Sequence, residues 1–104
     1  MVRYVHQLCL LALIPLAANA SEYPQMTLQA DSIICFDSDD WAEMIAASVD
    51  EDEAAMQRLI NKGACRHVTQ STQVSYLDPA AGGGALIQLR SGKTAYTADA
   101  FLSN

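Results

Sequence analysis

The sequence predicts an α+β fold, in which an N-terminal helical hairpin is stapled by a disulfide to a small antiparallel β-barrel. Three observations predict this fold. Apolar residues recur with helical spacing over residues 37–63, and they alternate with a period of two over much of 64–104. Cys35 and Cys65 flank the helical stretch. Because the two ends of a helical hairpin lie close in space, this placement brings both sulfurs into one neighbourhood.

The stretch 37–63 carries the start and stop signals of two helices. The acids and the serine at 37–40 suit the positive end of a first helix. Asp50 and Glu53 occupy the capping-box positions of a second helix, and Gly63 follows its last turn as a stop signal. The apolar residues expected to face the core are Trp41, Met44, Ile45 and Val49 from the first helix and Met56, Leu59 and Ile60 from the second.

Short strands are predicted on both sides of the hairpin. Before it, Met26 and Leu28 alternate with polar residues, which favours a strand. After it, turn residues separate several short alternating stretches. The expected elements there are a strand over 73–78, a flexible turn over 79–84, strands over 85–89 and 93–97 joined by a tight turn at 91–92, and one helical turn over 98–102.

Residues 1–20 are typical of a cleavable secretory signal peptide. Arg3 precedes an apolar run over 8–18, and small residues stand at Ala18 and Ala20. The run of 11 apolar-rich residues is shorter than the roughly 20 that a membrane-spanning helix needs. We therefore expect cleavage after Ala20 and a single small domain over 21–104, located in the periplasm or secreted.

Removing residues 1–20 changes the net charge and the cysteine count of the remaining chain. The net charge changes from −6 to −7, and Cys35 and Cys65 remain as the only cysteines. Two cysteines in a small exported chain indicate a structural disulfide, which stabilises by about 3–4 kcal/mol. A redox pair normally has C-x-x-C spacing, and zinc needs more ligands than these cysteines and His67 provide. We expect no metal and no cofactor.

The charge is unevenly distributed along the chain. Nine acids and no base lie in 31–53, whereas five bases and two acids lie in 58–104. An acidic chain disfavours binding to nucleic acid or to an anionic membrane surface. Two interpretations of the acidic stretch remain: solvated helix ends, or a face for a basic protein partner. The acids that are candidates for such a face are Asp39, Asp40, Glu43 and Glu51.

Three motifs that would indicate a phosphate-binding loop, a calcium loop or a hydrolase triad are incomplete in this sequence. Ser91-Gly92-Lys93-Thr94 resembles the end of a phosphate-binding loop, but Ile87 occupies the position of its first glycine. The acids after residue 37 lack the glycine and the final glutamate of a calcium loop. His67 has serines nearby but no evident orienting acid or oxyanion hole. We expect no enzymatic activity, and an unrecognised hydrolase remains the alternative.

Two segments, 71–77 and 91–102, resemble a bacterial SH3-like domain. The second contains that family's ending: a turn with glycine, a small residue, an aromatic residue, one helical turn and a final aromatic-leucine pair. The resemblance covers about 40 of the 104 residues and implies an SH3-like β part over 64–104. Members of the family often bind cell-wall peptides or protein segments. The resemblance implies a groove bordered by Tyr76, Tyr96 and Phe101.

Two functional hypotheses follow. The first is a small periplasmic, non-enzymatic protein-interaction module, of the inhibitor or immunity type, whose acidic stretch meets a basic cleft on another protein. The second is a cell-wall (peptidoglycan) binding domain that acts through its SH3-like half.

Overall fold

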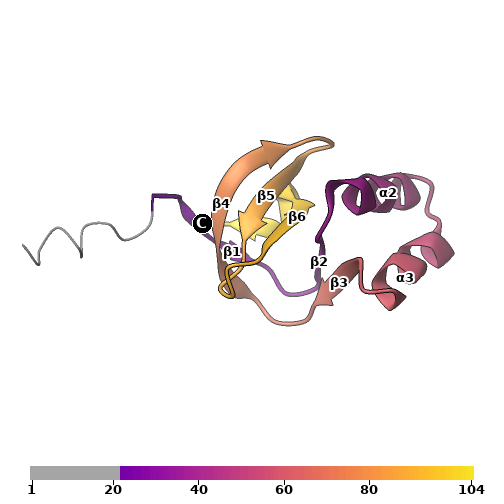
Figure 1. Cartoon of the computed structure of the whole chain (residues 1–104), viewed down its shortest axis with the longest axis horizontal. Helices are drawn as coiled ribbons and strands as arrows, with labels where there is room; N and C mark the ends of the chain where they lie inside the picture. The colour runs from indigo at the N-terminus through magenta and orange to yellow at the C-terminus, as the bar shows by residue number, and fades with distance from the viewer. Residues whose placement is uncertain (1–21) are drawn as a thin grey trace, which may run out of the picture.

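The computed structural model describes residues 22–104, so the predicted signal peptide at 1–20 lies outside the described residues. The strands are β1 (Gln25–Leu28), β2 (Ser32–Cys35), β3 (Cys65–Val68), β4 (Thr72–Ala80), β5 (Gly84–Gln88), β6 (Thr94–Ala98) and β7 (Leu102–Ser103). The helices are α2 (Ser38–Val49), α3 (Glu53–Asn61) and the single 3₁₀ turn η1 (Asp99–Phe101) (Figure 1).

The described strands form one antiparallel sheet in the order β3-β2-β6-β5-β4-β1-β7. The predicted α+β class is confirmed, but two details of the prediction were wrong. The helical hairpin is not N-terminal, because the alternation at Met26 makes β1, paired with β4, and the apolar residues before Cys35 make β2, paired with β3. The sheet is not a closed barrel, because β3 pairs only with β2 and β7 only with β1.

One face of the sheet encloses the first core cluster. Side chains alternate between the two faces of a strand, so Tyr76, Ile87 and Ala95, which are aligned across β4, β5 and β6, point to the same side. Buried residues from five strands fill this side: Leu28, Ile34, Val74, Ala85, Ile87 and Ala95. Every fully buried residue of this cluster lies on a strand.

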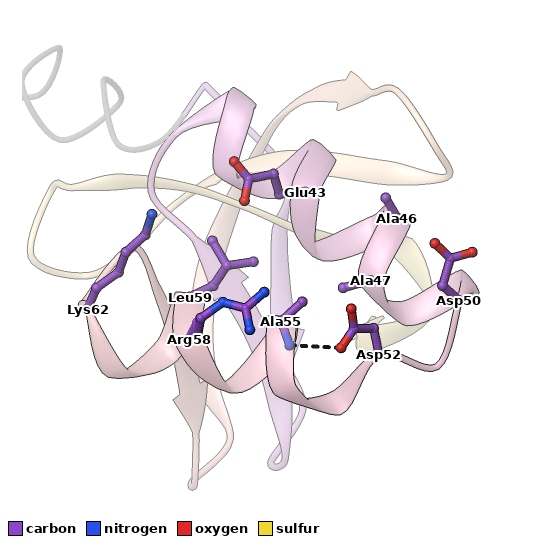
Figure 2. Close-up of a pocket in the computed structure, with 9 residues that line it drawn as sticks. All are labelled: Glu43, Ala46, Ala47, Asp50, Asp52, Ala55, Arg58, Leu59 and Lys62. Carbon is purple, nitrogen blue, oxygen red and sulfur yellow. Dashed lines mark hydrogen bonds between the residues drawn. The ribbon is translucent and has the colours of Figure 1, made fainter.

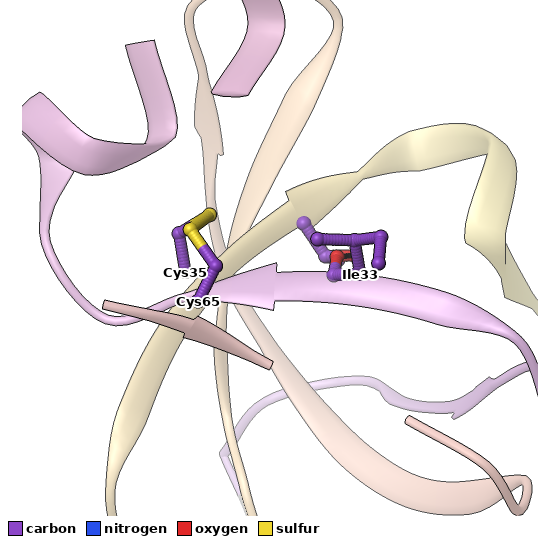
Figure 3. The surroundings of a disulfide bond; sticks show 4 residues. Ile33, Cys35 and Cys65 are labelled. Carbon is purple, nitrogen blue, oxygen red and sulfur yellow. Dashed lines mark hydrogen bonds between the residues drawn. A yellow bond between two sulfur atoms is a disulfide. The ribbon is translucent and has the colours of Figure 1, made fainter. Parts of the chain in front are cut away.

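The other face carries the helical hairpin and a second core cluster. Ile34 faces the first cluster, whereas its neighbour Cys35 faces the helices. The residues buried under the helices are Cys35, Trp41, Met44, Leu59 and Cys65. Cys35 and Cys65 lie directly opposite each other on β2 and β3, with their Cα atoms 4.0 Å apart, and form the predicted disulfide (Figure 3).

The helix boundaries follow the sequence signals with two differences. Val49 is 76% exposed, because α2 buries Trp41, Met44 and Ala47, at spacings of three residues, and this stripe leaves Val49 outside. Asp50 is the C-cap of α2 and not the cap of α3. That cap is Asp52, whose carboxylate accepts a hydrogen bond from the backbone N–H of Ala55 at 3.1 Å.

Gly82, in the β4–β5 turn, and Gly84, the first residue of β5, lie directly against α2, and we call these two residues the glycine seat. A Cβ atom at Gly84 would lie 2.9 Å from Trp41 Nε1, and one at Gly82 would lie 2.7 Å from Cδ1 of Ile45. Glycine at these positions therefore lets the β4–β5 turn approach α2 closely, and Figure 1 shows this turn extending toward the helix. The segment predicted as a flexible turn holds the hairpin against the sheet.

Candidate functional site

The outward side of α2 combines acids with small apolar residues. With helical spacing, the buried stripe through Trp41 and Met44 leaves the opposite side to solvent. Six exposed residues share that side, and we call them the α2 face: Asp39, Ala42, Glu43, Ala46, Val49 and Asp50. Apolar residues thus run along the helix beside a row of carboxylates.

The carboxylates of the α2 face have no internal partner. Within residues 22–104, the one ion pair joins His67 to Asp31, at 3.5 Å. No side-chain hydrogen bond of the described residues involves Asp39, Glu43 or Asp50. Their negative charge is therefore available to a binding partner.

A groove of about 350 Å³ runs between α2 and α3, beside the α2 face (Figure 2). Glu43 and Asp50 border it from α2, and Arg58 and Lys62 border it from α3. The acid Asp52 and four small or apolar residues complete the lining: Ala46, Ala47, Ala55 and Leu59. The groove therefore offers charges of both signs around an apolar floor.

The structure brings together only some of the predicted acidic contact residues. Asp39 and Glu43 are one helical turn apart on the α2 face. Asp40 is half-buried and lies in line with the buried Met44. Glu51 is exposed in the connection between the helices, where its φ of 54° is left-handed.

The three predicted aromatic residues do not border one common groove. Tyr76 and Phe101 are half-buried against the first core cluster. Tyr96 is half-buried against the second cluster, beneath the helices, because it pairs with Cys35 and shares that face of the sheet. Phe101 also contributes, with Trp41, to an apolar groove of about 240 Å³ beside α2.

A second charged surface was missed in the sequence. A hollow of about 540 Å³ is lined by two chain segments, 66–72 and 89–91, with Leu28 and Ile34 at its apolar side. We call it the basic hollow, because its charged lining residues are two arginines, Arg66 and Arg90, and His67 lies beside them. The excess of bases after residue 58 was the one signal for it, and no sequence pattern indicates that Arg66 and Arg90 lie close together.

The remaining motifs now have defined surroundings. The tight turn at 91–92 is confirmed, with the N–H of Gly92 donating to the carbonyl of Leu89 at 2.9 Å. His67 lies beside Asp31, but no serine hydroxyl of residues 22–104 forms a hydrogen bond with it. Among those residues, no group of three histidine, cysteine or acidic side chains is arranged to hold a metal ion.

No known family model, curated protein or solved structure matches this chain. In the described part of the chain, neither helix has the length and apolar character required to cross a membrane. The disulfide is typical of proteins outside the reducing cytoplasm.

Proposed function

We propose that this chain is an exported, non-enzymatic protein-interaction module, of the inhibitor or immunity type, and that it contacts its partner through the α2 face. One observation carries the proposal: the carboxylates of Asp39, Glu43 and Asp50 are exposed and without partners beside an exposed apolar stripe. Carboxylates that form no ion pair within the chain can attract a protein of opposite charge.

The chemistry of the α2 face suits a protein surface with basic residues around an apolar patch. Interfaces commonly have an apolar centre and a polar rim, and here Ala42, Ala46 and Val49 supply the apolar residues. Complementary charge accelerates association and excludes acidic partners. The disulfide and the glycine seat hold α2 in place. Binding through α2 therefore costs little conformational entropy, because the helix is already ordered.

Peptidoglycan binding by the β part is the second candidate. It rests on the resemblance of segments 71–77 and 91–102 to bacterial SH3-like domains. In the structure these segments contain β4, β6 and η1. Under this alternative, Tyr76 and Phe101 are the aromatic contacts, since Tyr96 lies under the helices.

Capture from periplasmic extract tests the first proposal. The wild-type mature chain is compared with the variant Asp39→Asn/Glu43→Gln, and Asp78→Asn serves as a control because Asp78 is an exposed acid on β4. We expect a protein captured by wild type and by the control at low salt, and lost with the double variant or at high salt. Equal capture by all three chains, or none by wild type, would contradict it.

Co-sedimentation with purified peptidoglycan tests the second candidate. If the β part binds the cell wall, Tyr76→Ala should reduce pelleting while Asp39→Asn/Glu43→Gln pellets like wild type. If the α2 face is the functional surface, neither wild type nor the variants should pellet.

A further inference from the structure

We propose that the basic hollow is a second binding site, and that it takes a peptide segment bearing carboxylates. The site goes beyond the proposed function, because it shares no residue with the α2 face and has the opposite charge. Its walls come from the β3–β4 connection and the β5–β6 turn, which both lie on the lower side of the sheet in Figure 1.

The charge of the hollow is the first argument. Its lining contains two arginines and His67 but no carboxylate. Asp31, which is 83% exposed, pairs with His67 at 3.5 Å and is not part of the lining. In a chain with a net charge of −6, a hollow that gathers two of the six lysine and arginine side chains is a local reversal of sign. Such a reversal favours a negatively charged ligand.

Phe36 brings a third cation close to the hollow. The guanidinium carbon of Arg66 lies 5.1 Å from the centre of the Phe36 ring, and the Lys93 ammonium lies 4.2 Å from it. Both contacts are within the range of cation–π attraction. One ring therefore holds two like charges near each other, and an anion in the adjacent hollow would relieve their repulsion.

The rest of the lining favours a peptide over a bare inorganic anion. The half-buried Leu89 gives the hollow an apolar contact, which an inorganic ion cannot use. Hydroxyl and amide groups give it further hydrogen-bond donors: Thr69, Gln70, Ser71, Thr72 and Ser91. Arginine binds a carboxylate in a bidentate manner, so Arg66 and Arg90 match one or two acidic side chains.

The position of β3 also favours an extended peptide. Arg66, His67 and Val68 belong both to the hollow and to β3, which is an edge strand of the described sheet. Edge strands offer main-chain groups to a peptide that adds as a further strand. A nucleic acid fits poorly, because its binding depends on many contacts between basic side chains and phosphates, and the acidic helices would repel it.

Titration of the mature chain with a fluorescent oligoglutamate peptide tests this site. We expect binding at low salt that weakens as salt is added, and no binding of an oligolysine peptide to the hollow. Arg66→Gln/Arg90→Gln should weaken oligoglutamate binding at least about tenfold. The matched control is Arg58→Gln/Lys62→Gln, which removes the same charge from the α2–α3 groove and should change the affinity by less than about twofold. Equal weakening by both pairs, or no binding by wild type, would overturn the proposal.

Two further measurements define the ligand class and the place of binding. Inorganic phosphate should displace the peptide only at far higher concentration. If phosphate displaces it at equal concentration, the hollow binds simple anions and the proposal of a peptide ligand is overturned. In wild-type protein, which avoids any folding defect of the variants, amide shifts on adding oligoglutamate should map to 66–72 and 89–91. Shifts confined to α2 would overturn the site. The variant Asp39→Asn/Glu43→Gln should retain oligoglutamate binding. The proposal for the basic hollow can therefore be wrong while the proposal for the α2 face is right, and the reverse.

Discussion

The two faces of the sheet are closed in different ways. On the first, strands alone form the core, and Leu28 and Ile87 have no exposed surface. On the second, two helices of 12 and 9 residues cover the core, and Trp41 and Met44 remain 7% and 4% exposed. The second core contains the disulfide, whereas the first has no covalent link among the described residues.

This difference explains why the outer side of the helical hairpin can carry unpaired charges. Helices this short are marginal in isolation, so the hairpin depends on packing and on its covalent bond. Because the bond and the glycine seat anchor the hairpin, surface ion pairs are not needed to hold it. Its outer side can therefore carry unpaired acids at little cost to the fold. Four variants test the comparison, from the largest expected effect to the smallest.

Ile87→Ala should have the largest effect, a loss of about 4 kcal/mol, because it leaves a cavity in the strand-only core. Urea unfolding followed by circular dichroism measures the loss. Val49→Ala is the control, since Val49 is 76% exposed, and it should change the stability by less than about 0.5 kcal/mol. Similar values for the two variants would refute the assignment of Ile87 to a sealed core.

Removal of the disulfide by Cys35→Ala/Cys65→Ala should lower the stability by about 3 kcal/mol. Hydrogen exchange should show that amides of α2 and α3 lose more protection than amides of β4 and β5. A reducing agent should reproduce the effect in wild type and do nothing to the double variant. Equal loss of protection in both regions would mean that the bond does not act on the hairpin in particular.

Gly84→Ala should lower the stability by about 2 kcal/mol, because the new methyl group would crowd Trp41 and the Thr97 carbonyl. Gly83→Ala is the matched control: its φ of 74° costs about 1 kcal/mol, but nothing lies within 4 Å of the added atom. Trp41 is the only tryptophan, so its emission reports the contact directly. The emission should shift in Gly84→Ala alone, and an unchanged spectrum would argue against the glycine seat.

Asp52→Ala should have the smallest effect, about 1 kcal/mol, because it removes the hydrogen bond to the Ala55 N–H. Asp37→Ala provides a close control, since Asp37 is the N-cap of α2 but its side chain forms no capping hydrogen bond. Thermal unfolding should rank the two losses in that order. The reverse order would contradict the assignment of the functional cap to Asp52.

Local signals in the sequence predicted much of the fold. The helical hairpin, the strand at Met26, the turn at Gly92 and the disulfide all follow from spacing, capping and turn chemistry. The sequence did not show that the residues before Cys35 form a strand of the same sheet. Four apolar residues in a row carry no period, and only pairing with β3 and β6 determines their structure.

The charged surfaces were predictable to different degrees. Asp39 and Glu43 share one helix, so helical spacing alone puts them on one side. Arg66 and Arg90 belong to segments that meet only through the sheet, and their proximity depends on its topology. The separation of Tyr96 from Tyr76 has the same origin: Tyr76 aligns with Ile87 and Ala95, and Tyr96, the residue after Ala95, faces the opposite side.

The pairing of β1 with β7 also has a consequence for the order in which the chain folds. Thr27 lies opposite Ser103, so most of the described chain forms the loop that this contact closes. Contacts between distant residues form slowly, because the entropy of a long loop must be lost first. The neighbouring strands β4, β5 and β6 need only short loops, so they should assemble early and β7 should dock late. Until β7 docks, β1 pairs with β4 alone, so the edge of the sheet at β1 stays open while the rest of the sheet is formed.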